Sequence, residues 1–363
     1  MDVPLVDLAW QHAEVEQQVL SGWHDVLAAG DFIQGEQVDL FEREFAAFSN
    51  VRHCIGVNSG TDALELALRA AGVGRGDEVL VPVNTFAATA MAVTRLGALV
   101  RLVDVDDVTY NVTPELVAAA ISPRTRAVIP VHLYGQAADI EGIRAAAGSD
   151  LVVIVDAAQA HGVRTRGGGV LGGARAAATS FYPSKNLGAY GDAGAVLTDD
   201  DDVAAAVRSF RNYGRVSAYE HPTVGANSRL DTLQAVVLRA KLERLADWNR
   251  RRAAAAAIYT TLLAGVAGVT TPVAVADHVW HLYVVRVAGR DRMLDALHAG
   301  GIGAAVHYPT PLHLQGAFRA LGHGAGDFPV AEAHRGELLS LPLFPGITPA
   351  QQEHVVATIR AVR

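Results

Sequence analysis

Short apolar runs alternate with amphipathic stretches between about Val51 and Thr198. Helices are expected to begin near Asp62, Thr85, Thr113 and Ile140. The runs that predict strands lie at residues 53–57, 78–82, 99–105, 126–134, 151–157, 178–182 and 194–198. Several of them are apolar throughout rather than alternating, which is typical of a parallel sheet covered on both faces. The repeated strand–helix order predicts an α/β layer architecture with right-handed crossovers.

The C-terminal third has a different pattern. One helical pattern runs from Arg229 to about Leu263, long enough that we expect it to bend or to connect domains. Beyond it the pattern predicts strands at 281–287 and 304–309 and helices at 290–299, near 330–340 and at 349–362. We therefore expect a large α/β domain at 1–250 and a small α+β domain at 251–363. The pattern does not fix where the N-terminal segment packs.

Bulk composition excludes several classes of function. Half of the 363 residues are apolar, and a net charge of −8 argues against non-specific binding to nucleic acid. The single cysteine, Cys54, excludes an internal disulfide and a cysteine-based metal site, and it suits a reducing cytoplasm. The N-terminal sequence has no basic leader and no apolar core, so no signal peptide is expected. No membrane-spanning stretch is evident.

Almost all of the basic residues are arginines. Of the 30 basic residues only Lys185 and Lys241 are lysines. Arginine replaces lysine on a surface, but its guanidinium does not lose a proton and so cannot attack a carbonyl group. Lys241 lies in a charged amphipathic stretch and is expected on a solvated helix surface, as is the run 250–252. Lys185 has no charged neighbour for several residues on either side, which is the context expected of a Schiff-base lysine.

A strand–turn–helix at residues 53–68 is a candidate phosphate site. Ser59, Gly60 and Thr61 form the turn, and Asp62 opens the helix. Free N–H groups and the positive end of the helix dipole attract an anion, and glycine lets the backbone approach it closely. The alternative is an ordinary helix cap, because serine, threonine and aspartate are favoured at any helix start.

Two further residues lie at the end of a predicted strand or shortly after one. Asp156 lies at the carboxyl end of the strand at 151–157, where open α/β sheets bind their ligands. Its carboxylate could keep a ring nitrogen protonated, or it could cap the next segment. Lys185 follows the strand at 178–182, and desolvation there would lower its pKa and permit imine formation. The alternative is a lysine on a surface loop.

The order of these parts resembles that of the fold-type-I pyridoxal-phosphate enzymes, and more narrowly the nucleotide-sugar aminotransferases of the DegT/DnrJ/EryC1/StrS family. The resemblance runs from VPLVDL near the N-terminus to LPLFPGIT near the C-terminus. It is carried by NSGTDAL, VPVNTFAATA, DAAQAHG, SFYPSKNLGAYGDAGA, NSRLDTLQA and HYPTPLH. It implies an aspartate-aminotransferase-like fold with a mostly parallel seven-stranded sheet and a smaller α+β domain.

The resemblance also implies roles at the cofactor. Lys185 would form the Schiff base with pyridoxal phosphate and then move a proton, while the cofactor alternates with pyridoxamine phosphate. Asp156 would pair with the ring nitrogen, Gln159 would bind the ring hydroxyl and Phe86 would stack on the ring. The residues expected to hold the phosphate are Gly60, Thr61, Ser180 and, from the partner subunit of a homodimer, Asn227.

On the substrate side the resemblance implies that His307 and Tyr308 line a sugar site with Phe32 near its mouth. The run from Lys185 to Asp192 is similar to the branch that aminates C3 of dTDP-linked 3-keto-6-deoxyhexoses. The branch that aminates C4 usually has a different run here, so C3 is favoured and C4 is the alternative. L-Glutamate is the expected amino donor, and secondary-metabolite deoxysugars are the expected products.

Other readings of the motifs are less favoured. The glycines at 167–172 match a dinucleotide fingerprint in form but do not lie directly between a strand and a helix. No HExxH motif accompanies the histidines. A sugar dehydratase of the same family would carry histidine in place of Lys185, and a desulfurase would need Cys54 on a mobile loop. A non-catalytic regulatory protein on this fold would have no reason to keep Lys185 and Asp156 together with the phosphate turn.

Overall fold

The computed structural model describes residues 1–273 and 275–362. Its large sheet has the strand order β1-β7-β6-β5-β4-β2-β3. The seven strands are β1 (His53–Val57), β2 (Glu78–Pro82), β3 (Leu99–Val103), β4 (Thr125–Val128), β5 (Val152–Asp156), β6 (Ala176–Ser180) and β7 (Gly194–Thr198). Only β7 runs against its neighbours β1 and β6. The prediction of a mostly parallel seven-stranded sheet is confirmed.

This topology has one consequence for function. Because β1, β2, β3, β4, β5 and β6 are parallel, their carboxyl ends meet at one edge of the sheet. Helix α4 starts at this edge directly after β1 and packs across β5, β6 and β7. The helices of this half are α3 (Glu36–Ser49), α4 (Gly60–Ala70), α5 (Ala87–Arg95), α6 (Pro114–Ala120), α7 (Ile140–Ala147) and α8 (Asp201–Phe210).

A second, antiparallel sheet has the order β10-β9-β8. Its strands are β8 (Val269–Thr270), β9 (Tyr283–Val287) and β10 (Leu338–Leu341). The other C-terminal helices are α10 (Arg290–Ala299), α11 (Pro329–Arg335), α12 (Pro349–Ala361) and the short 3-10 helices η2 (Leu312–Leu314) and η3 (Gly316–Leu321). Of these, α10 contacts β9 and β10, whereas η2, η3 and α11 contribute buried residues to the core of the large sheet. Another 3-10 helix, η1 (Leu133–Gly135), follows β4 in the large sheet.

The strand predicted at 304–309 is wrong. Only Ala305 forms a β-bridge there, to Ser340, and the third strand of the small sheet is instead β10. Pro309 and Pro311 supply no N–H for a ladder, which favours an irregular segment. The helix expected near 330–340 ends at Arg335, and a short apolar run then pairs with β9.

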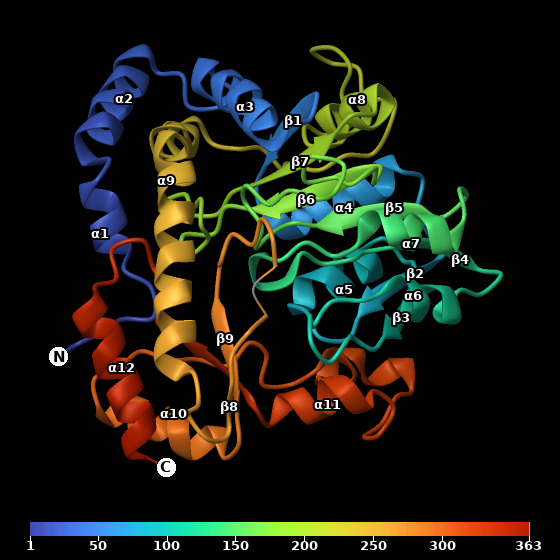
Figure 1. Ribbon diagram of the computed structural model, residues 1–363. Coiled ribbons are helices and arrows are strands. Elements are labelled where there is room, and N and C mark those ends of the chain that lie inside the picture. The colour runs from blue at the N-terminus through green and yellow to red at the C-terminus, as the bar shows by residue number, and fades with distance from the viewer. Residues whose placement is uncertain (274, 363) are drawn as a thin grey trace.

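Helix α9 (Thr232–Leu263) is continuous for 32 residues. Figure 1 shows it standing between the N-terminal helices α1 (Leu8–Ala13) and α2 (Glu16–Ala29) and the large sheet, with α12 beside its other end. The helix continues without a break through residue 250, the predicted end of the first domain. Val3, from the N-terminal segment, packs in the core of the small sheet. The division into domains at 1–250 and 251–363 stays a prediction.

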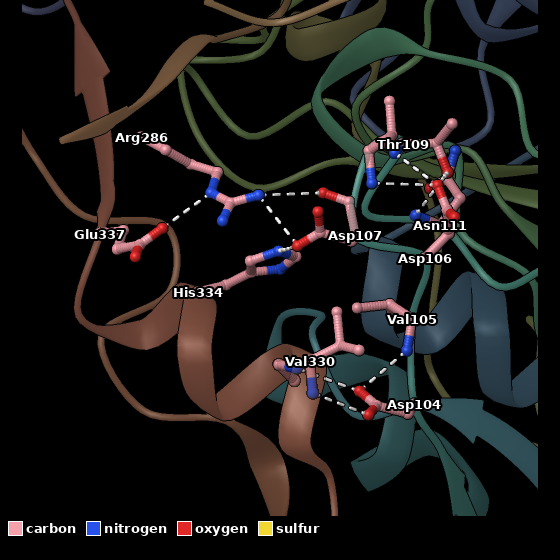
Figure 2. Close-up of polar contacts among 12 residues, drawn as sticks. Asp104, Val105, Asp106, Asp107, Thr109, Asn111, Arg286, Val330, His334 and Glu337 are labelled. Atoms are coloured by element: carbon pink, nitrogen blue, oxygen red, sulfur yellow. Dashed lines mark hydrogen bonds and ion pairs between the residues drawn. The ribbon is translucent and has the colours of Figure 1, made fainter. Parts of the chain in front are cut away.

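Polar contacts join the two sheets, as Figure 2 shows. Asp104, directly after β3, accepts hydrogen bonds from the backbone N–H groups of Val330 and Ala331 at the start of α11. Asp107 pairs with Arg286 of β9 and lies 2.9 Å from Nε2 of His334. These contacts hold the C-terminal elements against the loop that leaves β3.

The surface position predicted for Lys241 is wrong. Its side chain is buried, with Nζ donating to the Gly188 carbonyl at 2.8 Å and lying 4.5 Å from the centre of the Tyr190 ring. Arg252 is also buried and donates to the carbonyl of Leu343. Long stems let both side chains cross an apolar layer and reach carbonyl groups, which a polarity pattern cannot distinguish from a surface position.

Burial lowers the pKa of Lys241 to about 8, whereas an unfolded chain keeps it near ~10.4. Between these values the unfolded state binds more protons, so stability contributed by this site rises with pH. We expect the unfolding free energy of the wild type, relative to Lys241→Met, to increase by about 1–3 kcal/mol between pH 8 and pH ~10. Urea unfolding at several pH values measures this difference. A difference that does not change with pH would contradict it.

Candidate active site

A cavity of about 480 Å³ opens at the carboxyl edge of the large sheet. One wall comes from segments that follow β1, β2, β4, β5 and β6, and another comes from the C-terminal part of the chain. Its lining residues include Ser59, Gly60, Thr61, Thr85, Phe86, Val131, Asp156, Gln159, Ser180, Tyr182, Lys185, Asp192, His281, His307 and Tyr308. Residues distant in sequence therefore share one space because parallel strands end together.

The turn before α4 is built for close approach. Ser59 caps the helix by accepting a hydrogen bond from the N–H of Asp62 at 3.2 Å. A methyl group on Gly60 would lie 2.5 Å from Cβ of Ser180, so only glycine fits without movement. The start of α4 thus faces the cavity beside Ser180, with its N–H groups and positive dipole end available to an anion.

Asp156 ends β5 inside this cavity. Thr89 of α5 donates to its Oδ2 at 2.8 Å, and the N–H of Ala158 donates to its Oδ1 at 3.1 Å. Burial raises the pKa of Asp156, while these two hydrogen bonds and the charge of Lys185 oppose the rise. The carboxylate is therefore held in a fixed orientation and can pair with a cationic N–H.

Lys185 supplies a primary amine to the same cavity. It lies in a turn closed by its own N–H and the carbonyl of Tyr182. Removal from water lowers the pKa of Lys185 to about 8, against the opposing attraction of Asp156. Roughly a tenth of the amine is thus unprotonated at pH 7, far more than for an ordinary lysine, and this form can act as nucleophile or base.

Gln159 joins the two walls. Its Oε1 accepts from the backbone N–H of Tyr134 at 2.6 Å, and its Nε2 donates to the Tyr308 hydroxyl at 2.9 Å. The Tyr134 hydroxyl donates to the carbonyl of His307. Phe86 is 60% exposed, with its ring centre 6.0 Å from that of Tyr308. One N–H of the Gln159 amide remains for a ligand, so its expected contact with a ring hydroxyl stays a prediction.

Two predicted site residues do not line this cavity. Asn227 is exposed, although the next residue, Ser228, donates to Asp62 of the phosphate turn at 2.8 Å. Phe32 is 45% exposed, and its carbonyl accepts from the N–H of Thr232. Neither residue lines the cavity of its own chain, and the roles expected of both stay predictions.

Among the site residues that sequence reasoning missed are Thr89, Tyr134 and His281. Thr89 lies within the quoted motif VPVNTFAATA, three residues after Phe86, and one helical turn brings it to the same face. Tyr134 and His281 stand in segments with no recognised motif. Their positions depend on how the chain packs, and no local pattern could have identified them.

The structure also shows the surroundings of the residues considered for the less favoured functions. Cys54 is buried in β1, and burial raises its thiol pKa, so it is a poor nucleophile. Residues 167–172 form turns with no strand directly before or helix directly after them. Within 1–273 and 275–362 no cluster of three metal-ligating side chains is found, and no helix of that part is long and apolar enough to span a membrane.

Comparisons with known proteins agree with this geometry. The model of the DegT/DnrJ/EryC1/StrS aminotransferase family matches residues 14–360. The erythromycin biosynthesis sensory transduction protein EryC1 of Saccharopolyspora erythraea is 48% identical over 99% of this chain and 100% of its own length. The dTDP-3-amino-3,4,6-trideoxy-alpha-D-glucose transaminase of Streptomyces venezuelae is 44% identical over 99% of this chain and 95% of its own.

Solved structures show the same likeness. The crystal structure of S. venezuelae DesV in complex with a ketimine intermediate superposes with a TM-score of 0.96. It is 44% identical, and the match covers 99% of this chain and 98% of that one. The predicted fold-type-I architecture is confirmed.

The close packing at Gly60 gives a test of the phosphate turn. Gly60→Ala forces Ser180 or the first turn of α4 to move, so we expect affinity for pyridoxal phosphate to fall at least about tenfold. Spectrophotometric titration of the apoprotein measures this. Gly74→Ala is the matched control, because a methyl group there meets nothing within 4 Å. Unchanged affinity in Gly60→Ala would contradict the assignment.

Proposed function

Because this chain belongs to the DegT/DnrJ/EryC1/StrS aminotransferase family, we propose that it transfers an amino group to a nucleotide-linked keto sugar with pyridoxal phosphate as cofactor. The favoured reaction converts a dTDP-3-keto-6-deoxyhexose to its 3-amino sugar with L-glutamate as donor. The observation that carries the proposal is one cavity lined by Asp156, Lys185 and the start of α4. The name of the Streptomyces venezuelae relative supports amination at C3.

The residues of the cavity fit this cofactor. The N-terminus of α4, where Gly60 packs closely against Ser180, suits a phosphate group. The carboxylate of Asp156 suits a protonated ring nitrogen. Phe86 offers an exposed ring face. Bound pyridoxal phosphate supplies a carbonyl group that carries the amino group and a ring that withdraws electrons. The site thus offers a partner for the phosphate group and for the ring nitrogen of the cofactor.

Lys185 and Asp156 divide the work of proton transfer. With its pKa lowered to about 8, Lys185 can take a proton from a substrate carbon and return it elsewhere, as general base and then general acid. Asp156, held by Thr89 and the N–H of Ala158, would keep the ring nitrogen of the cofactor protonated. The contacts of Asp156 fix where its charge lies, so no reorganisation is needed during reaction.

We further propose that the active unit is a homodimer in which Asn227 reaches the phosphate site of the partner. Its exposed side chain supports this, as does Ser228, which ties its segment to the phosphate turn through Asp62. Phe32 would lie near the mouth of a site in the same assembly. A cytoplasmic location and a role in secondary metabolism stay predictions.

Regulatory function is less well supported. EryC1 is named a sensory transduction protein. A purely regulatory protein would gain nothing from a desolvated amine beside a buried carboxylate, since burial of both groups costs stability. The cavity of this chain keeps both.

A substrate panel tests the proposed function. With L-glutamate as donor, we expect dTDP-3-keto-6-deoxyhexoses to be aminated at least about 100-fold faster than their 4-keto isomers. Chromatography of the products measures both rates. Lys185→Arg should be inactive, because guanidinium keeps its proton. Amination only at C4 would overturn the regiochemistry, and no amination of any sugar would overturn the function.

Mixed dimers test the role of Asn227. In a dimer of Lys185→Ala and Asn227→Asp chains, one site receives both changes and the other receives neither if Asn227 acts across the interface. Equal mixing with subunit exchange should then restore about a quarter of wild-type activity, from inactive parents. If Asn227 served its own subunit, every site would remain defective and mixing would restore nothing.

A further inference from the structure

His281 lies in the cavity wall just before β9, where no sequence motif drew attention to it. It is buried, and burial together with the charge of Lys185 lowers its pKa well below the ordinary value. The ring is therefore uncharged at neutral pH. An uncharged imidazole carries one proton, and its function depends on which nitrogen holds that proton.

The contacts of Asn186 determine the tautomer of His281. The amide Nδ2 of Asn186 donates to the carbonyl of Val279 at 2.8 Å and to Oδ1 of Asn249 at 3.0 Å. A carbonyl oxygen only accepts, so the nitrogen of the Asn186 amide must face Val279. Its oxygen then lies 3.2 Å from Nδ1 of His281, and that nitrogen must carry the proton.

Nε2 of His281 is consequently an acceptor without a proton. Among residues 1–273 and 275–362, none donates a hydrogen bond to it. The backbone is held as well, because a methyl group on Gly135 would lie 2.9 Å from the His281 nitrogen, and Arg252 lies 3.5 Å from the His281 carbonyl. The side chain thus presents a fixed lone pair at the cavity.

Two other residues that line the same cavity, His307 and Tyr308, are also uncharged. Burial lowers the pKa of His307 to about 4 and raises that of the Tyr308 hydroxyl. Lys185 is the only lysine or arginine among the described lining residues. This wall suits hydroxyl groups, which can donate to a lone pair, and disfavours carboxylates, which only accept.

We propose that His281 is a specificity-determining residue whose Nε2 accepts a hydrogen bond from a hydroxyl group of the keto-sugar substrate. The inference rests on the proposed function, because it assigns this wall to the sugar rather than to the amino-acid donor. Loss of the acceptor therefore impairs the half-reaction with the sugar and spares the half-reaction with glutamate.

The tautomer is tested first, by NMR of the holoenzyme labelled with ¹⁵N-histidine. We expect His281 to be neutral with its proton on Nδ1. His278 is the internal control, because its Nδ1 accepts from the N–H of Trp280 at 2.9 Å and its proton must lie on Nε2. The variants His281→Phe and His278→Gln assign the signals. A proton on Nε2 of His281, or a charged ring at pH 7, would overturn the inference.

The two half-reactions are then measured separately, from the absorbance of the bound cofactor in single-turnover experiments. For His281→Phe we expect the rate with the sugar to fall at least about tenfold and the rate with L-glutamate to change less than about threefold. His281→Gln, which returns an oxygen near the place of Nε2, should recover part of the loss. His278→Gln should alter neither half-reaction. Equal losses in both half-reactions would indicate a structural role and overturn the proposal.

Substrate pairs that differ by one hydroxyl group identify the contact. The wild type should lose at least about tenfold with the analogue that lacks the hydroxyl, whereas His281→Phe should not distinguish the pair. If both proteins discriminate equally against every deoxy analogue, the proposal fails while the aminotransferase function stands. If the wild type aminates no sugar at all, the proposed function fails and this inference fails with it.

Discussion

The site depends on one electrostatic constraint, the shared burial of Asp156 and Lys185. Withdrawal from water raises the pKa of the carboxyl group and lowers that of the amine. The charge of each group partly reverses the pKa shift of the other. The opposite charge of the partner lowers the cost of burying each group. Thr89 and the N–H of Ala158 complete the arrangement by binding the carboxylate. The parallel strands make it possible, because β5 and β6 end at the same edge and deliver both residues to one cavity.

Much of the fold and the sheet side of the site could be predicted because their signals are local. The apolar runs gave β1, β2 and β7 with their observed bounds. Ser59 to Asp62 lie just after β1, Asp156 ends β5, and Lys185 lies a few residues beyond β6. Burial of long cations could not be predicted in the same way. Lys241 and Arg252 are charged residues, so their residue types predict a surface position. Their aliphatic stems nevertheless cross apolar layers and bring the charged ends to carbonyl groups. The tautomer of His281 could not be predicted from the sequence at all, since it follows from contacts among three segments.

Both lysines act on the same loop, which changes the meaning of their scarcity. Lys185 lies in the loop between β6 and β7, and Lys241 donates to the carbonyl of Gly188 and lies against the ring of Tyr190 within the same loop. A compact ammonium group fits one carbonyl and one ring face, whereas a guanidinium presents five donors and would leave several unsatisfied in that space. Lysine is thus kept at one position by its chemistry and at the other by the size of its charged group.

The two walls of the cavity differ in how they are built and in what they can vary. The sheet wall carries the charges and the phosphate turn, and its positions are set by strand pairing. The C-terminal wall carries the uncharged His281, His307 and Tyr308, and it is attached through side chains: Gln159 to Tyr308, Tyr134 to His307, and Asp107 to Arg286. Substitutions on the second wall can therefore change which hydroxyl groups are recognised without moving Asp156 or Lys185. A family that aminates many sugars by one chemistry needs this separation, and the tertiary structure provides it.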